Sequence, residues 1–403
     1  MSRILYDVAV IGAGPAGAQA AVSAAHQMRH VLVLDAAPIS QRKGRAYWSK
    51  SVEIQDAPVF ERVTGPRFAR ALQRWMGAQP VRAVTIGGRE RLAGIEYRPG
   101  VVLRVRPVPP EPDELAPAGH LLELEVSTRA LPTSPAPRAR PAHGEGDQGA
   151  AGQGQSAGAQ APPAPAAPPA SPAPLHVERF YARTVVVASG FEDVWPDIEV
   201  EPGVPRLYQR YRTLFRYAGN RKGWHVCIRC DGHLHVDEHL AILAAGDLAW
   251  GIARGAQDFT DRMTILTNGR PHGFTSEQLE VLQQRGIKIE EEAVVAHMGK
   301  GTDLLGLRLA DGRELYFDGF LLDYGLQPNT EYLRPEDGWA LQRDEDGLLV
   351  IDEDGQVLDE GGTPVPGLFA AGDIVAGQRN LIATAFGLGQ NAGLSASDLM
   401  REW

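Results

Sequence analysis

The chain carries two stretches in which short apolar runs flank a helical pattern. Short, uninterrupted apolar runs are typical of buried parallel strands, whereas apolar residues that recur every three to four positions indicate a helix. The order strand, helix, strand is typical of βαβ units. We therefore predict two dinucleotide-type folds rather than two copies of a short repeat. The predicted elements are 6–11, 14–28 and 31–34 in the first unit, and 239–243, 247–259 and 263–266 in the second.

One long segment interrupts this pattern. Residues 131–174 consist mainly of Pro, Ala, Gly, Gln and Ser and contain almost no large apolar side chain. Such a segment cannot bury enough surface to offset the entropy lost on ordering, so we predict that it is disordered. It lies between strand-like stretches at 121–128 and 176–187. We interpret it as a long loop inserted into a hairpin rather than a domain boundary, with a docking tether as the alternative.

Composition narrows the class of protein. A chain of 403 residues is long enough for two or three domains, and 43% apolar residues suffice for sizeable cores. A net charge of −10 argues against a dedicated nucleic-acid binder, which needs a basic face. We find no apolar run of about 18 residues, the length that a spanning helix needs, and no secretory signal pattern at the N-terminus. We therefore expect a cytoplasmic protein without nucleic-acid or membrane partners.

A glycine motif follows the first predicted strand and opens the first predicted helix. In Gly12-x-Gly14-x-x-Gly17, the three glycines allow a tight turn, close approach to a pyrophosphate and close packing of helix on strand. Asp35 ends the next strand, where a carboxylate accepts a hydrogen bond from an unphosphorylated ribose. The motif therefore predicts FAD or NAD rather than NADP. The predicted cofactor-binding residues here are Gly12, Gly14, Pro15, Ala16, Gly17 and Asp35.

A second element near the C-terminus decides between these cofactors. Residues 365–371 read as a strand that runs into Gly372 and Asp373 ahead of a helix, which places a carboxylate and backbone amides near a polyol or phosphate. With these residues, the chain resembles the low-molecular-weight thioredoxin reductases among the pyridine nucleotide-disulfide oxidoreductases. Further landmarks are Thr64-Gly-Pro, Ala188-Ser189-Gly190, Pro328-Asn-Thr330 and Arg379-Asn380-Leu381.

The resemblance covers nearly the whole chain except the 131–174 segment. It implies FAD as cofactor, a homodimer, and a two-domain α/β fold in which the FAD domain is discontinuous. The domains that we predict are 1–221 and 327–403 for FAD binding and 222–326 for an inserted NAD(P)H-like domain. The resemblance adds these residues to the predicted cofactor site: Ser189, Gly190, Gly372, Asp373, Arg379, Asn380 and Leu381.

Both cysteines of the chain lie in one motif, Cys227-Ile-Arg-Cys230-Asp231-Gly. The spacing allows a small redox disulfide or a thiolate of lowered pKa. A zinc site with His233 and His235 is the alternative, but these histidines are only two residues apart; two inert buried thiols are another. By resemblance, Cys230 faces the flavin, Cys227 exchanges with the substrate, and Asp231 moves the thiol protons. We predict no metal, and we expect His225 to be a surface or core residue rather than a catalyst.

The second dinucleotide motif departs from the family pattern. The family carries Gly-x-Gly-x-x-Ala, but here the first glycine is Ala244, whose Cβ penalises a positive φ and crowds a pyrophosphate. The family's His-Arg-Arg stretch is replaced by Thr267-Asn-Gly-Arg270. We therefore predict weak or absent NADPH binding. The alternative is that alanine is tolerated and that Arg262 and Arg270 suffice.

The 266–269 stretch resembles that of a branch of thioredoxin-reductase-like flavoproteins that lacks the NADPH determinants. This branch includes dithiol oxidases of natural-product pathways and reductases that receive electrons from ferredoxin. The small-molecule oxidases of that branch mostly carry proline after the first cysteine, where this chain has Ile228. We therefore expect an FAD-dependent thiol–disulfide oxidoreductase whose partner is a thioredoxin-like protein or a small dithiol or disulfide. The alternatives are an ordinary NADPH-dependent thioredoxin reductase and a non-enzymatic flavin- or zinc-binding module.

Overall fold

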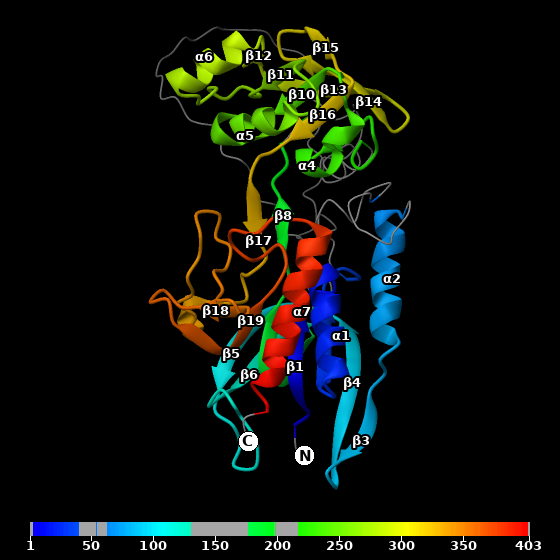
Figure 1. Ribbon diagram of the computed structural model, residues 1–403, viewed down its shortest axis with the longest axis vertical. Coiled ribbons are helices and arrows are strands. Elements are labelled where there is room, and N and C mark those ends of the chain that lie inside the picture. Colours follow the sequence, from blue (N-terminus) through cyan, green and yellow to red (C-terminus); the bar gives the residue numbers. More distant parts are fainter. Residues whose placement is uncertain are drawn as a thin grey trace, which may run out of the picture.

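The computed structural model describes residues 3–39, 54, 63–129, 176–196, 198 and 217–401. The predicted insert at 131–174 lies outside these residues. The described chain forms two units, one above the other in Figure 1, and two crossing strands join them.

The lower unit is built on a nine-stranded sheet whose centre is parallel. β1 pairs in parallel with β2 and β7, and β19 and β4 extend this parallel core on either side. The central strands are apolar runs buried on both faces, as expected for parallel strands between covering layers. The strands are β1 (Leu5–Ile11), β2 (His30–Asp35), β3 (Arg82–Ile86), β4 (Arg89–Pro99), β5 (Val101–Val108), β6 (Leu121–Ser127), β7 (Val177–Val187), β18 (Gln356–Leu358) and β19 (Pro364–Ala370).

Three helices accompany this sheet. α1 (Pro15–His26) and α7 (Ile382–Asp398) run side by side, and α2 (Gly65–Gly77) stands beside them (Figure 1). α1 is almost entirely buried because its alanines and glycines let strand and helix approach closely. Proline at its first position suits a helix start, since the missing N–H has no helical partner there.

The upper unit repeats the parallel arrangement on a smaller scale. Its five-stranded sheet has the order β12–β11–β10–β16–β9, and a three-stranded antiparallel sheet packs beside it. The strands are β9 (Trp224–His225), β10 (Leu240–Leu243), β11 (Met263–Leu266), β12 (Lys288–Glu290), β13 (Val294–Lys300), β14 (Asp303–Leu309), β15 (Glu314–Tyr316) and β16 (Gly319–Leu322). The helices are α4 (Ile228–Asp231), α5 (Gly246–Ala256) and α6 (Ser276–Gln284).

The neck between the two units is a short antiparallel pair. β8 (Phe191–Asp193) pairs with β17 (Leu326–Pro328), so the chain leaves the lower unit and returns to it at adjacent points (Figure 1).

The predicted fold class, α/β with two dinucleotide-type sheets, is confirmed. β6 and β7 are neighbouring antiparallel strands, as expected for strands on either side of a long hairpin insert. The domain boundaries at 221/222 and 326/327 remain predictions. In the described part of the chain, no helix combines the length and apolar character needed to span a bilayer.

Candidate functional site

A cavity of about 790 Å³ lies where the two units face each other. Residues from the first glycine turn, the start of α7, the neck and the cysteine motif all border it. Every residue of the predicted site lines this cavity except Gly17. The structure therefore brings together cofactor and redox residues that lie up to about 370 positions apart in the chain, from Gly12 to Leu381.

The first glycine turn has the geometry that its sequence predicts. Gly12 has a φ of +106°, a conformation that side-chain-bearing residues rarely adopt. A Cβ on Gly17 would overlap the carbonyl oxygen of Gly12, so this glycine serves helix packing rather than the cavity. At Gly14 a Cβ would meet no atom within 4 Å, because this position faces the open cavity. The turn thus leaves room for a ligand at Gly14.

Asp35 ends β2 at the same edge of the sheet. The side chain is buried, Oδ2 accepts a hydrogen bond from the Tyr97 hydroxyl at 2.8 Å, and Oδ1 accepts one from the Ala37 amide at 3.0 Å. Each carboxylate oxygen has two lone pairs, so both can accept a further hydrogen bond from a ligand hydroxyl. Asp35 is therefore held in place by the protein and still able to bind a ribose.

The Gly372–Asp373 element lies opposite this turn. Gly372 has a φ of +79°, and a Cβ there would approach the Ala16 side chain to 2.7 Å. Burial raises the pKa of Asp373 to about 6, and among the described residues we find no donor to its carboxylate. Arg379, Asn380 and Leu381 follow at the start of α7 and border the same cavity. A half-buried acceptor that has no donor among the described residues fits the hydroxyls of a bound polyol.

Ser189 borders the cavity, and its side chain also forms hydrogen bonds within the protein. Its hydroxyl donates to the carbonyl oxygen of Asn329 at 2.6 Å and lies 2.9 Å from the Tyr332 hydroxyl. The Asn329 amide in turn donates to the carbonyl of Gly190 at 3.0 Å. The Ser189 side chain thus fastens the two crossing segments of the neck to each other, and the Ser189–Gly190 backbone borders the cavity.

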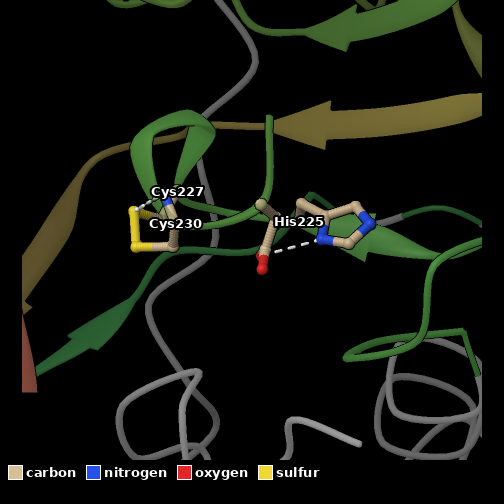
Figure 2. The surroundings of a disulfide bond; sticks show 4 residues. His225, Cys227 and Cys230 are labelled. Carbon is tan, nitrogen blue, oxygen red and sulfur yellow. Dashed lines mark hydrogen bonds and ion pairs between the residues drawn. A yellow bond between two sulfur atoms is a disulfide. The ribbon is translucent and has the colours of Figure 1, made fainter. Parts of the chain in front are cut away.

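Cys227 and Cys230 are joined in a disulfide at the cavity wall (Figure 2). Cys227 caps α4, and its Sγ accepts a hydrogen bond from the Cys230 amide at 3.2 Å. Glycines place α4 against the upper unit: a Cβ on Gly232 would lie 2.5 Å from Phe259 Cδ2, and one on Gly255 would lie 3.1 Å from Ile228. The two sulfur atoms are bonded to each other, so in this state neither is available to a metal.

Asp231, the predicted proton-transfer residue, borders the cavity directly after Cys230. Its Oδ2 lies 2.8 Å from Nδ1 of His225; Figure 2 shows this contact as a dashed line, with the His225 ring pointing away from the disulfide. His225 is buried, as expected of a core residue, but no pattern in the sequence connects it with Asp231.

Sequence reasoning missed two further carboxylates at the cavity, Asp193 in the neck and Asp323 after β16. Burial, together with the nearby Asp323 and Asp373, raises the pKa of Asp193 to about 7. Burial also raises the pKa of Asp323. Asp323 directly follows the apolar run 319–322, so its place at the carboxyl end of a parallel strand was a usable signal. Asp193 follows no comparable pattern.

The second glycine turn has a different shape from the first. The amide of Ala244 donates to Leu266 as that of Gly12 donates to Leu34, so the two residues correspond. The expected strain at Ala244 is absent, because it is not among the residues with positive φ; Gly246, with φ +58°, takes the left-handed conformation instead. The prediction that Ala244 is strained by a positive φ is therefore wrong. Its side chain packs in the core.

The loop at His272–Gly273 packs on the second turn at the start of α5. The Gly246 amide donates to the carbonyl of His272 at 2.8 Å, and a Cβ on Gly273 would lie 3.4 Å from the Gly246 Cα. The side chain of Asp247, next in the helix, accepts from Gln278 at 3.1 Å. An amide that would face a phosphate at a helix start thus already has a backbone partner.

Arg270 is turned toward the protein. Its guanidinium lies 4.1 Å from the Tyr324 ring centroid, and its Nε donates to the Thr267 carbonyl at 3.2 Å. Its Nη2 is buried and has no hydrogen-bond partner among the described residues. Arg262, the other predicted alternative, donates to the Asp237 carbonyl at 3.1 Å. Neither arginine pairs with the second turn.

The residues of the first cavity fit FAD. An open position at Gly14, an aspartate for a ribose, and a half-buried acceptor at Asp373 border the same cavity. These features define a two-dinucleotide-domain protein with a redox disulfide beside its cofactor cavity, the architecture of the flavin-linked disulfide oxidoreductases.

The comparison with known families agrees. The sequence pattern of the pyridine nucleotide-disulphide oxidoreductases matches residues 175–389, more than half of the chain. The chain belongs to this family, as the resemblance of its sequence predicts.

Relatives of known sequence and structure resemble it more distantly. It is 29% identical over 229 residues to the F component of the alkyl hydroperoxide reductase from Staphylococcus aureus, an alignment that covers 54% of this chain and 39% of that protein. The chain thus spans about two fifths of the length of such relatives. The fold matches the thioredoxin reductase of Streptococcus pyogenes over the full length of both chains, with a TM-score of 0.63 and 18% identity. It also matches HlmI, with a TM-score of 0.66, 19% identity, and 98% and 92% of the two chains covered.

Proposed function

We propose that this protein is an FAD-dependent thiol–disulfide oxidoreductase in which the flavin and the Cys227–Cys230 pair exchange two electrons. The observation that carries the proposal is that the disulfide and the Gly12–Gly14 turn border one cavity. Gly12, Gly14 and Asp35 would hold the adenosine and pyrophosphate parts, and Asp373 with Arg379 the remainder. When bound, FAD supplies or accepts the electron pair.

The protein's own residues carry out the thiol chemistry. A substrate thiolate attacks Cys227 Sγ, the Cys227–Cys230 bond breaks, and Cys230 leaves as a thiolate; a second substrate thiolate then displaces Cys227, so that the substrate is oxidised and the cysteine pair is reduced. The reverse sequence reduces a substrate disulfide. Asp231, adjacent to Cys230, exchanges protons with the thiols. The proposed partner is a thioredoxin-like protein or a small dithiol or disulfide, and the proposed assembly is a homodimer in the cytoplasm.

We propose further that NADPH is not an efficient electron donor. Support comes from the second turn, where the Gly246 amide is bonded to His272, and from Arg270, which lies against Tyr324. A hydrogen bond to a charged group contributes about 1.5–3 kcal/mol, so two missing arginine contacts weaken binding by roughly three orders of magnitude.

The test is an anaerobic titration of the FAD-loaded protein, followed by flavin absorbance. Dithiothreitol is expected to bleach the flavin of the wild type but not of Cys227→Ser or Cys230→Ser. NADPH and NADH at about tens of micromolar, well below the dissociation constant expected for the weakened site, are expected to bleach the flavin slowly or not at all. Fast, stoichiometric bleaching by NADPH would establish an ordinary NADPH-dependent reductase instead. No bleaching by any reductant, with unchanged behaviour of Cys227→Ser, would leave only a flavin-binding module.

A further inference from the structure

Two buried histidines form a continuous chain of contacts behind Asp231. His225 Nδ1 lies 2.8 Å from Asp231 Oδ2, and His225 Nε2 lies 3.2 Å from Nε2 of His235. His235 Nδ1 lies 2.7 Å from Glu238 Oε2. Both rings are at most 2% exposed, whereas the Glu238 side chain is 25% exposed and pairs with the exposed Arg221. This row of side-chain contacts therefore leads from Asp231 at the cavity wall to solvent at Glu238.

The number of hydrogens in this chain is fixed by its chemistry. Three contacts link carboxylate, imidazole, imidazole and carboxylate, and each contact needs one hydrogen to be a hydrogen bond. A neutral imidazole carries one N–H, so two neutral rings supply only two hydrogens. All three contacts can be hydrogen bonds at once only when the four side chains together hold one proton more than two neutral imidazoles supply. His225 Nε2 also lies 3.3 Å from the Arg221 carbonyl oxygen, an acceptor that favours a hydrogen on that nitrogen.

The geometry favours His225 as the ring with two N–H groups, because Nδ1 faces the Asp231 carboxylate and Nε2 faces the Arg221 carbonyl oxygen. Burial lowers the pKa of His235, and His225 itself adds to this effect. Among the described residues, Asp231, Glu238 and Arg221 are charged groups that face the two rings, and Leu240 of β10 and Gly319 of β16 lie beside the His235 ring. A Cβ on Gly319 would lie 2.6 Å from His235 Nδ1, so this glycine provides the space that the ring occupies.

We propose that His225 and His235 are a proton relay that stores one proton behind Asp231 and exchanges it with solvent through Glu238. The proposal rests on the proposed thiol–disulfide function. When a dithiol reduces the pair, its thiolate attacks Cys227 and the S–S bond breaks. Cys230 leaves with the electron pair and takes a proton by way of Asp231. The relay supplies that proton from His225 and is refilled from solvent at Glu238; in the oxidative direction each transfer is reversed. His225 and His235 act through Asp231 and are positioning residues.

The relay can be tested on the full-length, FAD-loaded protein with dithiothreitol as the probe. The rate of Cys227–Cys230 reduction is measured anaerobically by quenched alkylation between about pH 6 and 9, the range that brackets ordinary His and Cys titration. Each rate is divided by the concentration of dithiothreitol thiolate. For the wild type, this normalised rate is expected to be high at low pH and to fall as the relay loses its proton. His235→Gln is expected to be about tenfold slower near pH 6, below the usual contribution of a direct general acid, and to lose the pH dependence.

Two further variants make the outcome decisive. Gly319→Ala keeps every ionisable group but displaces the His235 ring, and is expected to behave like His235→Gln. His239→Gln removes a nearby histidine that bonds to Thr264 instead, and is expected to keep the wild-type profile. Profiles for His235→Gln and Gly319→Ala that coincide with the wild type, or are lowered by one factor at all pH values, would overturn the relay. Flavin absorbance in the same samples reports separately on the proposed function, and each electron pair that it records on FAD is added to the cysteine pairs that alkylation counts as reduced.

Discussion

At the scale of single residues, the site depends on positions whose neighbours leave no alternative. Gly12 has a positive φ, a Cβ on Gly17 would overlap the Gly12 carbonyl, and Gly14 faces the open cavity. These three roles could be predicted from the sequence because spacing and flanking elements determine them. The His225–His235 contact could not, because the residues between them carry no periodic signal that the two rings meet.

The open position at Gly14 gives the first residue-scale prediction. Gly14→Val is expected to abolish flavin binding, because a branched side chain would fill the space left for the pyrophosphate. The measurement is the ratio of flavin to protein absorbance after purification and after reconstitution with FAD. Gly387→Val is the control, since this exposed glycine of α7 also has open space around it but does not border the cavity. Full flavin content in Gly14→Val would contradict the assignment.

The buried carboxylate of Asp193 gives a second prediction, on stability. Its pKa is raised from 3.8 to about 7 on folding, so the folded state loses stability as pH rises through this window. Asp193→Asn removes the charge and is expected to stabilise the protein by on the order of 1–4 kcal/mol above about pH 7, and by little near pH 4. Denaturant unfolding at both pH values measures this. An equal effect at both would show that the carboxylate is not the cause.

At the scale of elements, short apolar runs were the most reliable signal. The strand predicted at 263–266 coincides with β11, whose four residues are all buried. The helix predicted at 247–259 ends earlier, at Ala256, because the amides of Phe259 and Thr260 both return to the Ala256 carbonyl and close the last turn. The shape of the second glycine turn was not predictable, since it depends on the His272–Gly273 loop that packs on it from a later part of the chain.

The hairpin of β6 and β7 carries the element-scale prediction. The two strands pair from Leu122–Ala182 to Ser127–Val177. Their paired ends lie side by side, so a short turn can connect them in place of the 131–174 segment. Replacing that segment by a short glycine-containing turn is expected to leave flavin content unchanged and to alter the melting temperature by less than about 3 °C, since only a loop-closure term of about 1–2 kcal/mol changes. Thermal unfolding followed by flavin fluorescence measures both. A larger loss of stability or of flavin would show that the segment packs on the fold.

At the scale of the whole molecule, the sequence predicted the parts but not their meeting place. Each glycine motif identified its own unit, and the resemblance connected them through a family pattern. Only the structure shows the Cys227–Cys230 disulfide and the Gly12–Gly14 turn at one cavity wall, and Asp193 and Asp323 beside them. Such contacts join residues from separate sheets, and no local pattern of polar and apolar positions encodes them.

The paired strands of the neck have an evolutionary consequence. Asp193 and Leu326 are paired across the neck, so the chain enters the upper unit and leaves it at neighbouring positions. The gene segment that encodes residues 194–325 could therefore be exchanged as one piece, because the two ends of the protein unit that it encodes lie next to each other. Recombination at this step would exchange the upper unit, with its Cys227–Cys230 pair, in one event and leave the sheet and core of the lower unit unchanged.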